Sequence, residues 1–332
     1  MKSPLTGKEM SIRHEKRMLS FRKEVIEIDF HYYFCGDTGE KFESDELAEL
    51  NHKQVLNKYR ERLNLPFPEK IIEIRKKYGI PASTMSDILG FGVNTYRNYE
   101  NGEVPSTANA RLIQLIEDPN ELIRIVNFSQ CLDQKEKEKI LRKTEQLAES
   151  KSSINQNMEH WLLNTGNPNE FNGYQMFNLE KTTNIVTFFS ERMQPWKTIM
   201  NKLLFYCDFY HFKKTDYSIT GLNYRAIPLG PVPSKFDSLF EYLADNQLLL
   251  KEYIQLAGEG SGEKFHPGSD SHFKPDLFNP GELEILDAVY AKFKELTTQQ
   301  IVDLSHREKA WTENQKDKKI ISYNYAFEIG ND

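Results

Sequence analysis

The chain has 332 residues, of which 39% are apolar and 28% charged, and a formal net charge of −6. This length exceeds one ordinary hydrophobic core, so we expect a globular protein of several domains. No stretch approaches the ~18 uninterrupted apolar residues of a membrane span, and MKSPLTGKEM lacks the apolar segment of a secretory signal. We therefore expect a cytoplasmic protein without membrane contact. Three widely separated cysteines exclude a disulfide framework and cannot by themselves fill a zinc site: Cys35, Cys131 and Cys207.

The charge is unevenly distributed. Between Lys53 and Leu115 there are ten basic and six acidic residues, which leaves about +4 there and about −10 elsewhere. The acidic total argues against indiscriminate nucleic-acid binding, because that contact depends on neutralising phosphates. One basic segment inside an acidic chain is still compatible with binding DNA at a defined site.

Residues 1–45 are predicted to form a small β unit. Residues 1–45 contain the alternating run EVIEIDFHYYF and glycine turns at Thr6-Gly7 and Thr38-Gly39, which predict short antiparallel strands. The spacing of apolar residues from Ser44 to Leu63 predicts a connecting helix, with Ser44 as its N-cap. Pro66 and Pro68 end that helix, because proline lacks an amide donor.

Helices are predicted for most of the remaining chain. Four or five short ones cover residues 69–127, and a charged linker helix follows through about Glu149. The Asn-, Ser- and Gly-rich residues 151–174 predict a flexible connection. Two strongly apolar helices are expected at about 181–193 and 196–212, followed by a turn-rich β stretch and further helices.

These elements predict an α+β protein that is mainly α. It would contain a small zinc-less β ribbon, a helix-turn-helix domain of four or five helices, and a helical C-terminal domain with a short β-sheet or hairpin. The predicted division of the chain is 1–65 for the ribbon with its helix, 66–128 for the helix-turn-helix, 129–175 for the linker, and 176–325 for the last domain.

The segment from Ile71 to Ile116 has the order of a helix-turn-helix: support helix, scanning helix, tight turn, recognition helix and closing helix. Gly90 falls at the turn, where glycine tolerates a positive φ, and Phe91 can fill the core beside it. We expect the recognition helix at about Gly92 to Asn101. Tyr96 and Tyr99 would then point into the core.

The opposite side of this helix would face outward with Asn94, Arg97 and Asn98. Asparagine pairs bidentately with adenine, and arginine with the O6 and N7 atoms of guanine. Thr95 would touch a thymine methyl group or a phosphate. The residues predicted to position the DNA through phosphate contacts are Ser83, Thr84, Lys76 and Lys77.

A polar face on a short helix is also what any solvated helix shows, so NTYRNYENG alone is a weak signal. The longer pattern is more specific, and over about fifty residues it resembles the Xre or Cro-like repressors. That pattern consists of Met85, Ile88, Leu89, Gly90, Phe91, Tyr96, Tyr99, Glu100, Gly102 and Pro105. In this interpretation Glu100 and Gly102 are structural, the acid tying neighbouring helices together and the glycine ending its helix.

The residues before the helix-turn-helix resemble the N-terminal β domain of MqsA or YgiT-type antitoxins, where two Cys-x-x-Cys-Gly turns hold a structural zinc. The matching places are Ser3-Pro4-Leu5-Thr6-Gly7 and Cys35-Gly36-Asp37-Thr38-Gly39-Glu40. Only one of four thiol ligands is present, and hydroxyls are poor substitutes for thiolates. We therefore predict a ribbon without metal and no other cofactor. An alternative site would recruit His14, His31 or His52 beside Cys35, but their spacing matches no zinc turn.

The C-terminal half contains no phosphate loop, metal signature or nucleophile elbow. Its aromatic run LLFYCDFYHF predicts a core helix, in which Asp208 must find a hydrogen-bond donor or lie at an opening. Over about 130 residues this half resembles the SocA-like, or Panacea, antitoxin domain. The resemblance rests on Lys202–Phe209, Ile219-Thr220-Gly221, Leu229–Pro233, Ser305-His306 and Ala310-Trp311.

This resemblance implies neutralisation of a toxin, whose identity differs among relatives. The residues that we select as candidate toxin contacts are Asp208, Tyr210, Tyr224, His306 and Trp311. For His306 and Trp311 the alternative is a hydrogen-bonded pair in the core.

Together these features predict a non-enzymatic antitoxin of a bacterial type II toxin–antitoxin system. Its C-terminal domain would bind a toxin encoded by the adjacent gene, and a homodimer would repress the shared operon by binding operator DNA. Two alternatives remain open. One is a mobile-element regulator or protease adaptor without a cognate toxin, and the other is an enzyme that uses Cys35, Asp208 or His306.

Overall fold

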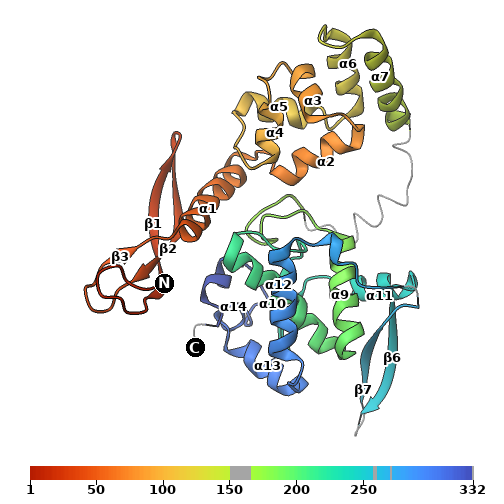
Figure 1. Cartoon of the computed structure of the whole chain (residues 1–332). Coiled ribbons are helices and arrows are strands. Elements are labelled where there is room, and N and C mark those ends of the chain that lie inside the picture. The colour runs from red at the N-terminus through yellow and green to blue at the C-terminus, as the bar shows by residue number, and fades with distance from the viewer. Residues whose placement is uncertain (150–165, 257–259, 270, 331–332) are drawn as a thin grey trace. The chain divides into compact units, whose positions relative to one another are not determined.

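The computed structural model describes residues 1–149, 166–256, 260–269 and 271–330. Helix is the main secondary structure and the sheets are small and antiparallel (Figure 1). The predicted fold class, α+β and mainly α with a helical C-terminal region and a short hairpin, is confirmed. Contacts divide the chain into two compact units. One comprises Met1–Leu19, Glu27–Gln54 and Leu162–Asp332, and the other comprises Ser20–Ile26 and Val55–Trp161.

The N-terminal ribbon is a three-stranded sheet in the order β1 (Ser11–Phe21), β2 (Glu24–Phe34) and β3 (Lys41–Phe42). Its two main strands have eleven residues each, so they are longer than the short strands expected from the sequence. Helix α1 (Asp45–Leu63) follows.

Two amide side chains of α1 complete the backbone hydrogen bonding of β2. Asn51 Oδ1 accepts from the His31 amide at 2.8 Å, and Asn51 Nδ2 donates to the His31 carbonyl at 2.9 Å. Gln54 makes the same pair of bonds with Asp29, at 3.0 and 2.8 Å. These bonds satisfy backbone groups that no strand pairs, which explains why two polar side chains are buried on α1.

Arginines of the second unit hold the loop that follows helix α4. Arg22, at the tip of the β1–β2 hairpin, donates to the backbone carbonyls of Val104 and Pro105 at 2.5 and 2.9 Å. Arg60 of α1, only 1% exposed, donates to the carbonyl of Gly102. Because charged donors make strong hydrogen bonds, these contacts fix the loop on the hairpin tip and on α1.

The remaining helices of this unit are α2 (Pro68–Tyr78), α3 (Ala82–Ile88), α4 (Thr95–Glu100), α5 (Thr107–Leu115), α6 (Pro119–Phe128) and α7 (Gln134–Glu149). They share one hydrophobic core, which includes Ile71, Met85, Tyr96, Ile113 and Leu122. Helix α7 was expected as a linker. Instead its Ile140, Leu141 and Leu147 pack against this core, because its apolar residues recur at helical spacing on one side.

The C-terminal region, residues 166–330, is built around one buried helix. Helix α10 (Lys197–Thr215) is buried along most of its length, from Ile199 to Phe212. A helix that is apolar on all sides is stable only inside a core. The other helices are α9 (Leu179–Met193), α11 (Phe236–Asp245), α12 (Pro280–Phe293), α13 (Thr298–Arg307) and α14 (Lys309–Thr312), with short 3₁₀ segments at Pro275–Leu277 and Tyr323–Glu328.

Two small sheets complete this region. The first has the order β5 (Gly230–Pro233), β4 (Tyr224–Ile227) and β8 (Ile320–Ile321), with Tyr224 opposite both Pro233 and Ile321. The second is the hairpin of β6 (Leu249–Leu256) and β7 (Gly260–Pro267). None of the described helices is long and apolar enough to cross a membrane.

The end of the predicted flexible connection is packed rather than loose. Tyr174 is fully buried, and its ring stacks on Phe212 with centroids 6.1 Å apart. Gly173, with a φ of 62°, lies so near Ser218 that an added Cβ would be 2.6 Å from the serine Cβ. The remainder of that predicted connection, residues 151–165, lies outside the described residues.

Candidate functional site

The turn before α4 has the positive φ that the sequence predicts at Gly90. It also has a positive φ at Asn94, where the sequence predicts helix. Gly90 has a φ of 68°, and Phe91 packs edge-on against Tyr99 with centroids 6.0 Å apart. Asn94 also has a positive φ, 63°, and caps α4. This left-handed residue interrupts the helix, so α4 begins at Thr95 rather than at about Gly92. Asparagine tolerates this conformation better than most residues do.

The inner side of α4 is formed by its two tyrosines, as predicted. Tyr96 is fully buried and Tyr99 is 5% exposed. The Tyr96 hydroxyl donates to the Ile71 carbonyl of α2 at 2.9 Å, and its amide donates to Ser86 Oγ of α3 at 3.0 Å. Burial raises the pKa of Tyr96, so this hydroxyl stays a donor. These two bonds set the position of α4 against its neighbours.

An ion pair supplies a further tie between α2 and α4. Arg75 Nε lies 2.5 Å from Glu100 Oε1, and Arg75 Nη1 donates to the Ile80 carbonyl at 3.1 Å. Both side chains are largely buried, with exposures of 20% and 10%. Glu100 therefore ties two helices together, which is the structural role expected for it.

The outer side of α4 carries the predicted base-reading residues. Asn94, Arg97 and Asn98 are all exposed, and Thr95 is half-buried. Val93 extends this surface and is 85% exposed. We name these five residues the α4 face. The exposure of Val93 was not predicted, although a single aliphatic residue in the polar run GVNTYRN could have indicated it.

The predicted phosphate contacts lie on the two preceding helices. Ser83 is exposed and Thr84 half-buried on α3. Lys76 is exposed on the last turn of α2, whereas the ammonium group of Lys77 donates to the Glu117 carbonyl at 3.0 Å. Their roles toward DNA remain predictions.

In the C-terminal region, Asp208 is fully buried and its carboxylate is enclosed by donors. Oδ1 accepts from the amides of Ile219 and Thr220, at 2.8 and 2.9 Å. Oδ2 accepts from the Thr220 and Tyr224 hydroxyls, the latter at 2.7 Å. Burial raises the pKa of Asp208, and these hydrogen bonds oppose that shift. Both oxygens are therefore occupied in joining α10 to the loop before β4.

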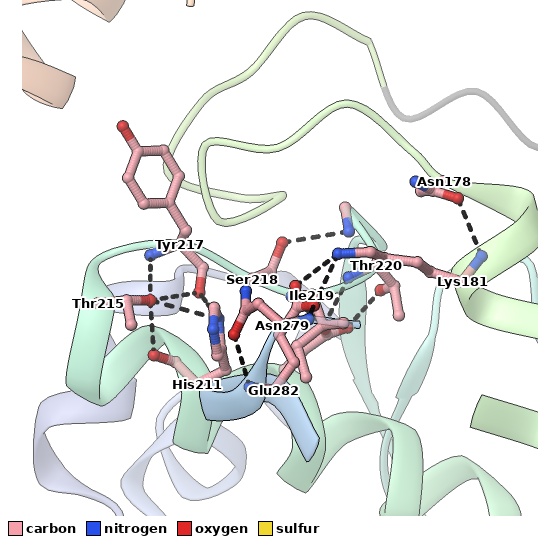
Figure 2. Close-up of polar contacts among 12 residues, drawn as sticks. Asn178, Lys181, His211, Thr215, Tyr217, Ser218, Ile219, Thr220, Asn279 and Glu282 are labelled. Atoms are coloured by element: carbon pink, nitrogen blue, oxygen red, sulfur yellow. Dashed lines mark hydrogen bonds and ion pairs between the residues drawn. The ribbon is translucent and has the colours of Figure 1, made fainter. Parts of the chain in front are cut away.

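Figure 2 shows a polar network at the same loop. His211 Nδ1 donates to the Tyr217 carbonyl at 2.7 Å. The Gly221 amide donates to Ser218 Oγ at 3.1 Å. Lys181 of α9 lies 2.6 Å from Glu282 of α12 in an ion pair whose acid is 6% exposed. The network fastens α9, α10 and α12 around the loop.

Lys202 is the second buried charge-bearing residue of α10. Its side chain is fully buried, and its amino group donates to the Pro231 carbonyl at 2.9 Å. Burial lowers the pKa of this amine to about 7. Gly230 has a φ of 97°, and a Cβ there would lie 2.4 Å from Ser305 Oγ and 2.7 Å from the Lys202 side chain. The close approach explains the glycine in the Leu229–Pro233 turn.

The His306 and Trp311 rings form a stacked pair, with centroids 3.8 Å apart and planes 10° from parallel. Trp311 Nε1 donates to the Ile227 carbonyl of β4 at 2.7 Å. Both residues are half-buried. Leu229, two residues beyond Ile227, is 55% exposed. We name Leu229, His306 and Trp311 the hairpin-turn patch.

The other predicted toxin contacts occupy different environments. Tyr224 is fully buried, like Asp208, so neither side chain is accessible to another protein in this structure. Tyr210 is half-buried, and its hydroxyl accepts from the Lys292 ammonium at 2.6 Å. The exposure of Leu229 was not predicted, because the sequence places it only inside a turn.

Cys35 lies in the ribbon, where it is 3% exposed. Hydrogen bonds from Thr38, Ser3 and Thr6 lower the pKa of its thiol to about 6. Its surroundings are therefore hydroxyl groups, whereas a nucleophilic cysteine is ordinarily activated by a histidine or lysine base.

Comparison with known families gives two matches. Residues 1–127 match the model for MqsA, the antitoxin component of a bacterial toxin–antitoxin system. Residues 200–312 match the model for the antitoxin SocA-like, Panacea domain. No curated protein matches the chain. The predicted resemblances to MqsA and to the Panacea domain are thus confirmed, and the resemblance to Xre or Cro-like repressors stays a prediction. The chain is similar at each end to an antitoxin family of toxin–antitoxin systems.

Proposed function

We propose that the chain is the antitoxin of a type II toxin–antitoxin system. It binds a toxin encoded next to it through the C-terminal region and represses its own operon through the α4 face. The observation that carries the proposal is the pair of antitoxin matches, one at each end of the chain. The described residues also offer no open reaction centre at Asp208, because its carboxylate is buried and enclosed by donors.

The α4 face supports DNA binding by its chemistry. Asn94, Arg97 and Asn98 supply the amide and guanidinium groups that read adenine and guanine in the major groove. Val93, exposed beside Asn94, adds an aliphatic group that fits a thymine methyl. Arg22 and Arg60 hold the loop after α4, so the face is presented on a fixed support. Such pre-organisation lowers the entropic cost of binding.

A dimer belongs to this proposal. One six-residue helix covers a single half-site, and specific affinity in repressors of this kind usually comes from two half-sites one helical turn apart. The operator is therefore expected to be a near-palindrome, and the complex to contain two chains per duplex.

For the toxin we assign the hairpin-turn patch as the contact. The patch combines one exposed aliphatic side chain with a half-buried aromatic stack, which is the composition of an interface anchor, since aromatic residues at the centre of an interface contribute most of its energy. Asp208 and Tyr224 act instead by holding the loop and β4 behind this patch.

The experiment is co-expression with the product of the adjacent gene. That product alone is expected to stop growth, and the full chain to restore growth and to co-purify with it. Leu229→Asp should abolish both effects. Leu250→Asp, which changes another half-exposed leucine on the β6–β7 hairpin, is the matched control and should retain both.

An adjacent product that is harmless by itself would rule out the antitoxin role. If operator binding persisted in that case, the alternative of a mobile-element regulator or protease adaptor without a cognate toxin would be favoured. Loss of neutralisation in both leucine variants would place the toxin contact elsewhere.

A further inference from the structure

Two turns of the ribbon have the same backbone hydrogen bonds although their sequences differ. In the first, the Ser3 amide donates to the Lys8 carbonyl at 2.8 Å and the Gly7 amide to the Ser3 carbonyl at 2.9 Å. In the second, the Cys35 amide donates to the Glu40 carbonyl at 3.0 Å and the Gly39 amide to the Cys35 carbonyl at 2.8 Å. The glycines have φ values of 70° and 72°. The two turns are therefore one conformation used twice.

The side chains of the two turns repeat as well. Thr6 and Thr38 stand at the fourth position of their turns, and each hydroxyl accepts from the amide two residues later, at 3.4 Å in both cases. Ser3 Oγ, at the first position, accepts from two amides of its own turn at 3.3 Å. These bonds point backbone N–H groups at the side-chain atoms of the first and fourth positions.

The four side chains at these positions meet. Thr6 Oγ1 lies 3.8 Å from Cys35 Sγ, and Ser3 and Thr38 also form hydrogen bonds with this thiol. Ser3 is 3% exposed, as is Cys35. A salt bridge of 2.9 Å between Lys8 and Asp37 joins the turns on the outside.

Paired turns with ligands at the first and fourth positions are the frame of a structural zinc site, which requires four thiolate or imidazole ligands in a tetrahedron. The donor set of this chain does not fit that metal, because three of its four positions carry neutral hydroxyls. Among the described residues, no three His, Cys, Asp or Glu side chains gather where they would hold a metal ion.

We infer that the ribbon is a metal-free form of this frame, in which a cluster of three hydroxyls and one thiol joins the turns in place of an ion. The two turns have the paired backbone conformation of a zinc site although their side chains cannot bind the ion, so this conformation does not depend on the metal. Two consequences follow. The natural chain folds its ribbon independently of zinc, and thiols at Ser3, Thr6 and Thr38 would rebuild a complete tetrahedral site.

The test is the full-length triple variant Ser3→Cys/Thr6→Cys/Thr38→Cys, purified under reducing conditions beside the natural chain. The variant is expected to bind one Co²⁺ per chain with the absorption bands of a tetrahedral tetrathiolate site, and to exchange it for one Zn²⁺. The natural chain is expected to bind neither ion stoichiometrically. Adding Cys35→Ser to the triple variant removes one ligand and should abolish the tetrathiolate spectrum.

Thermal unfolding provides a second readout that needs no engineered site. A chelator should shift the Tm of the natural chain by less than about 1 °C, because no metal contributes to its folding. The Tm of the metal-loaded triple variant should instead fall clearly on chelation.

Stoichiometric zinc in the natural chain, lost in Cys35→Ser, would overturn the inference. So would a folded triple variant without the tetrathiolate bands, because the turns would then not form the frame. If the triple variant does not fold, the response of the natural chain to the chelator still decides the first consequence.

Discussion

Helices α4 and α10 each belong to a motif that the sequence analysis singled out, but the polar residues of the α4 motif are exposed and those of the α10 motif are buried. On α4 the tyrosines are buried, and Asn94, Arg97 and Asn98 are exposed. On α10 the polar residues Lys202 and Asp208 are themselves fully buried. The α4 motif therefore leaves a polar face exposed, whereas the α10 motif describes an internal framework. The toxin contact proposed for the C-terminal region is accordingly placed outside the buried core of its motif.

The largest expected effect tests the internal role of Asp208. Asp208→Ala would leave four buried donors, two amides and two hydroxyls, without their acceptor. Each such group costs ~1–3 kcal/mol, so the free energy of unfolding should fall by at least about 4 kcal/mol. All three tryptophans lie at residue 161 or later, so urea denaturation followed by tryptophan fluorescence measures this loss. If the free energy of unfolding fell by less than about 1 kcal/mol while toxin binding was abolished, Asp208 would be a toxin contact. The contrast between exposed polar residues on α4 and buried ones on α10 would then not hold.

The next largest expected effect is the contribution of Lys202 to the pH dependence of the free energy of unfolding. Its pKa of about 7 in the folded chain lies below the ordinary 10.5, so between these values the unfolded chain binds more protons. Stability from this residue therefore rises with pH above 7, by about 1.4 kcal/mol per unit. Lys202→Met lacks this term. The stability difference between variant and natural chain should change by about 2 kcal/mol between pH 7 and pH 9, because the folded amine is already half deprotonated at pH 7. A constant difference across this range would show that Lys202 stays charged when folded.

The α4 face predicts a smaller effect that depends on DNA sequence. Arg97→Ala and Asn98→Ala should each cost about 1–3 kcal/mol of binding free energy, concentrated at particular base pairs of the operator. Fluorescence anisotropy with single-base operator variants measures it. Arg124→Ala, which removes an exposed arginine on α6, is the control and should leave sequence preference unchanged. Equal losses on every sequence would contradict base reading.

The smallest expected effect concerns the phosphate contact predicted for Lys76, which would position the chain on the duplex without reading its sequence. Lys76→Gln should weaken binding similarly on all sequences and reduce the slope of log affinity against log salt by about 1. Titrations at several salt concentrations provide that slope. An unchanged slope would remove Lys76 from the predicted phosphate contacts.

Sequence reasoning was strongest where local chemistry determines structure. The positive φ at Gly90 and the burial of Tyr96 and Tyr99 follow from turn geometry and helical spacing, and all three predictions are confirmed. The start of α4 was misplaced because Asn94 can be helical or left-handed, and its neighbours decide which. The support of the α4 loop by Arg22 was not predictable, because the two segments are 82 residues apart in sequence.

In the C-terminal region, the sequence indicates that buried Asp208 needs hydrogen-bond donors, but it does not indicate which residues supply them. The donors come from Ile219, Thr220 and Tyr224. Their convergence depends on how the loop folds over α10. The stacking of His306 on Trp311 likewise depends on the junction between α13 and α14. Sequence alone therefore leaves open whether these rings lie in the core or in a contact.

The most direct test of the account is growth of cells that express the adjacent gene product together with full-length variants of this chain. An Arg97→Ala/Asn98→Ala variant is predicted to restore growth as well as the natural chain does, because its change is confined to the α4 face. A Leu229→Asp variant is predicted to fail to restore growth while it still represses the operon promoter. Equal rescue by both variants, or equal failure of both, would contradict the separation of DNA reading from toxin binding.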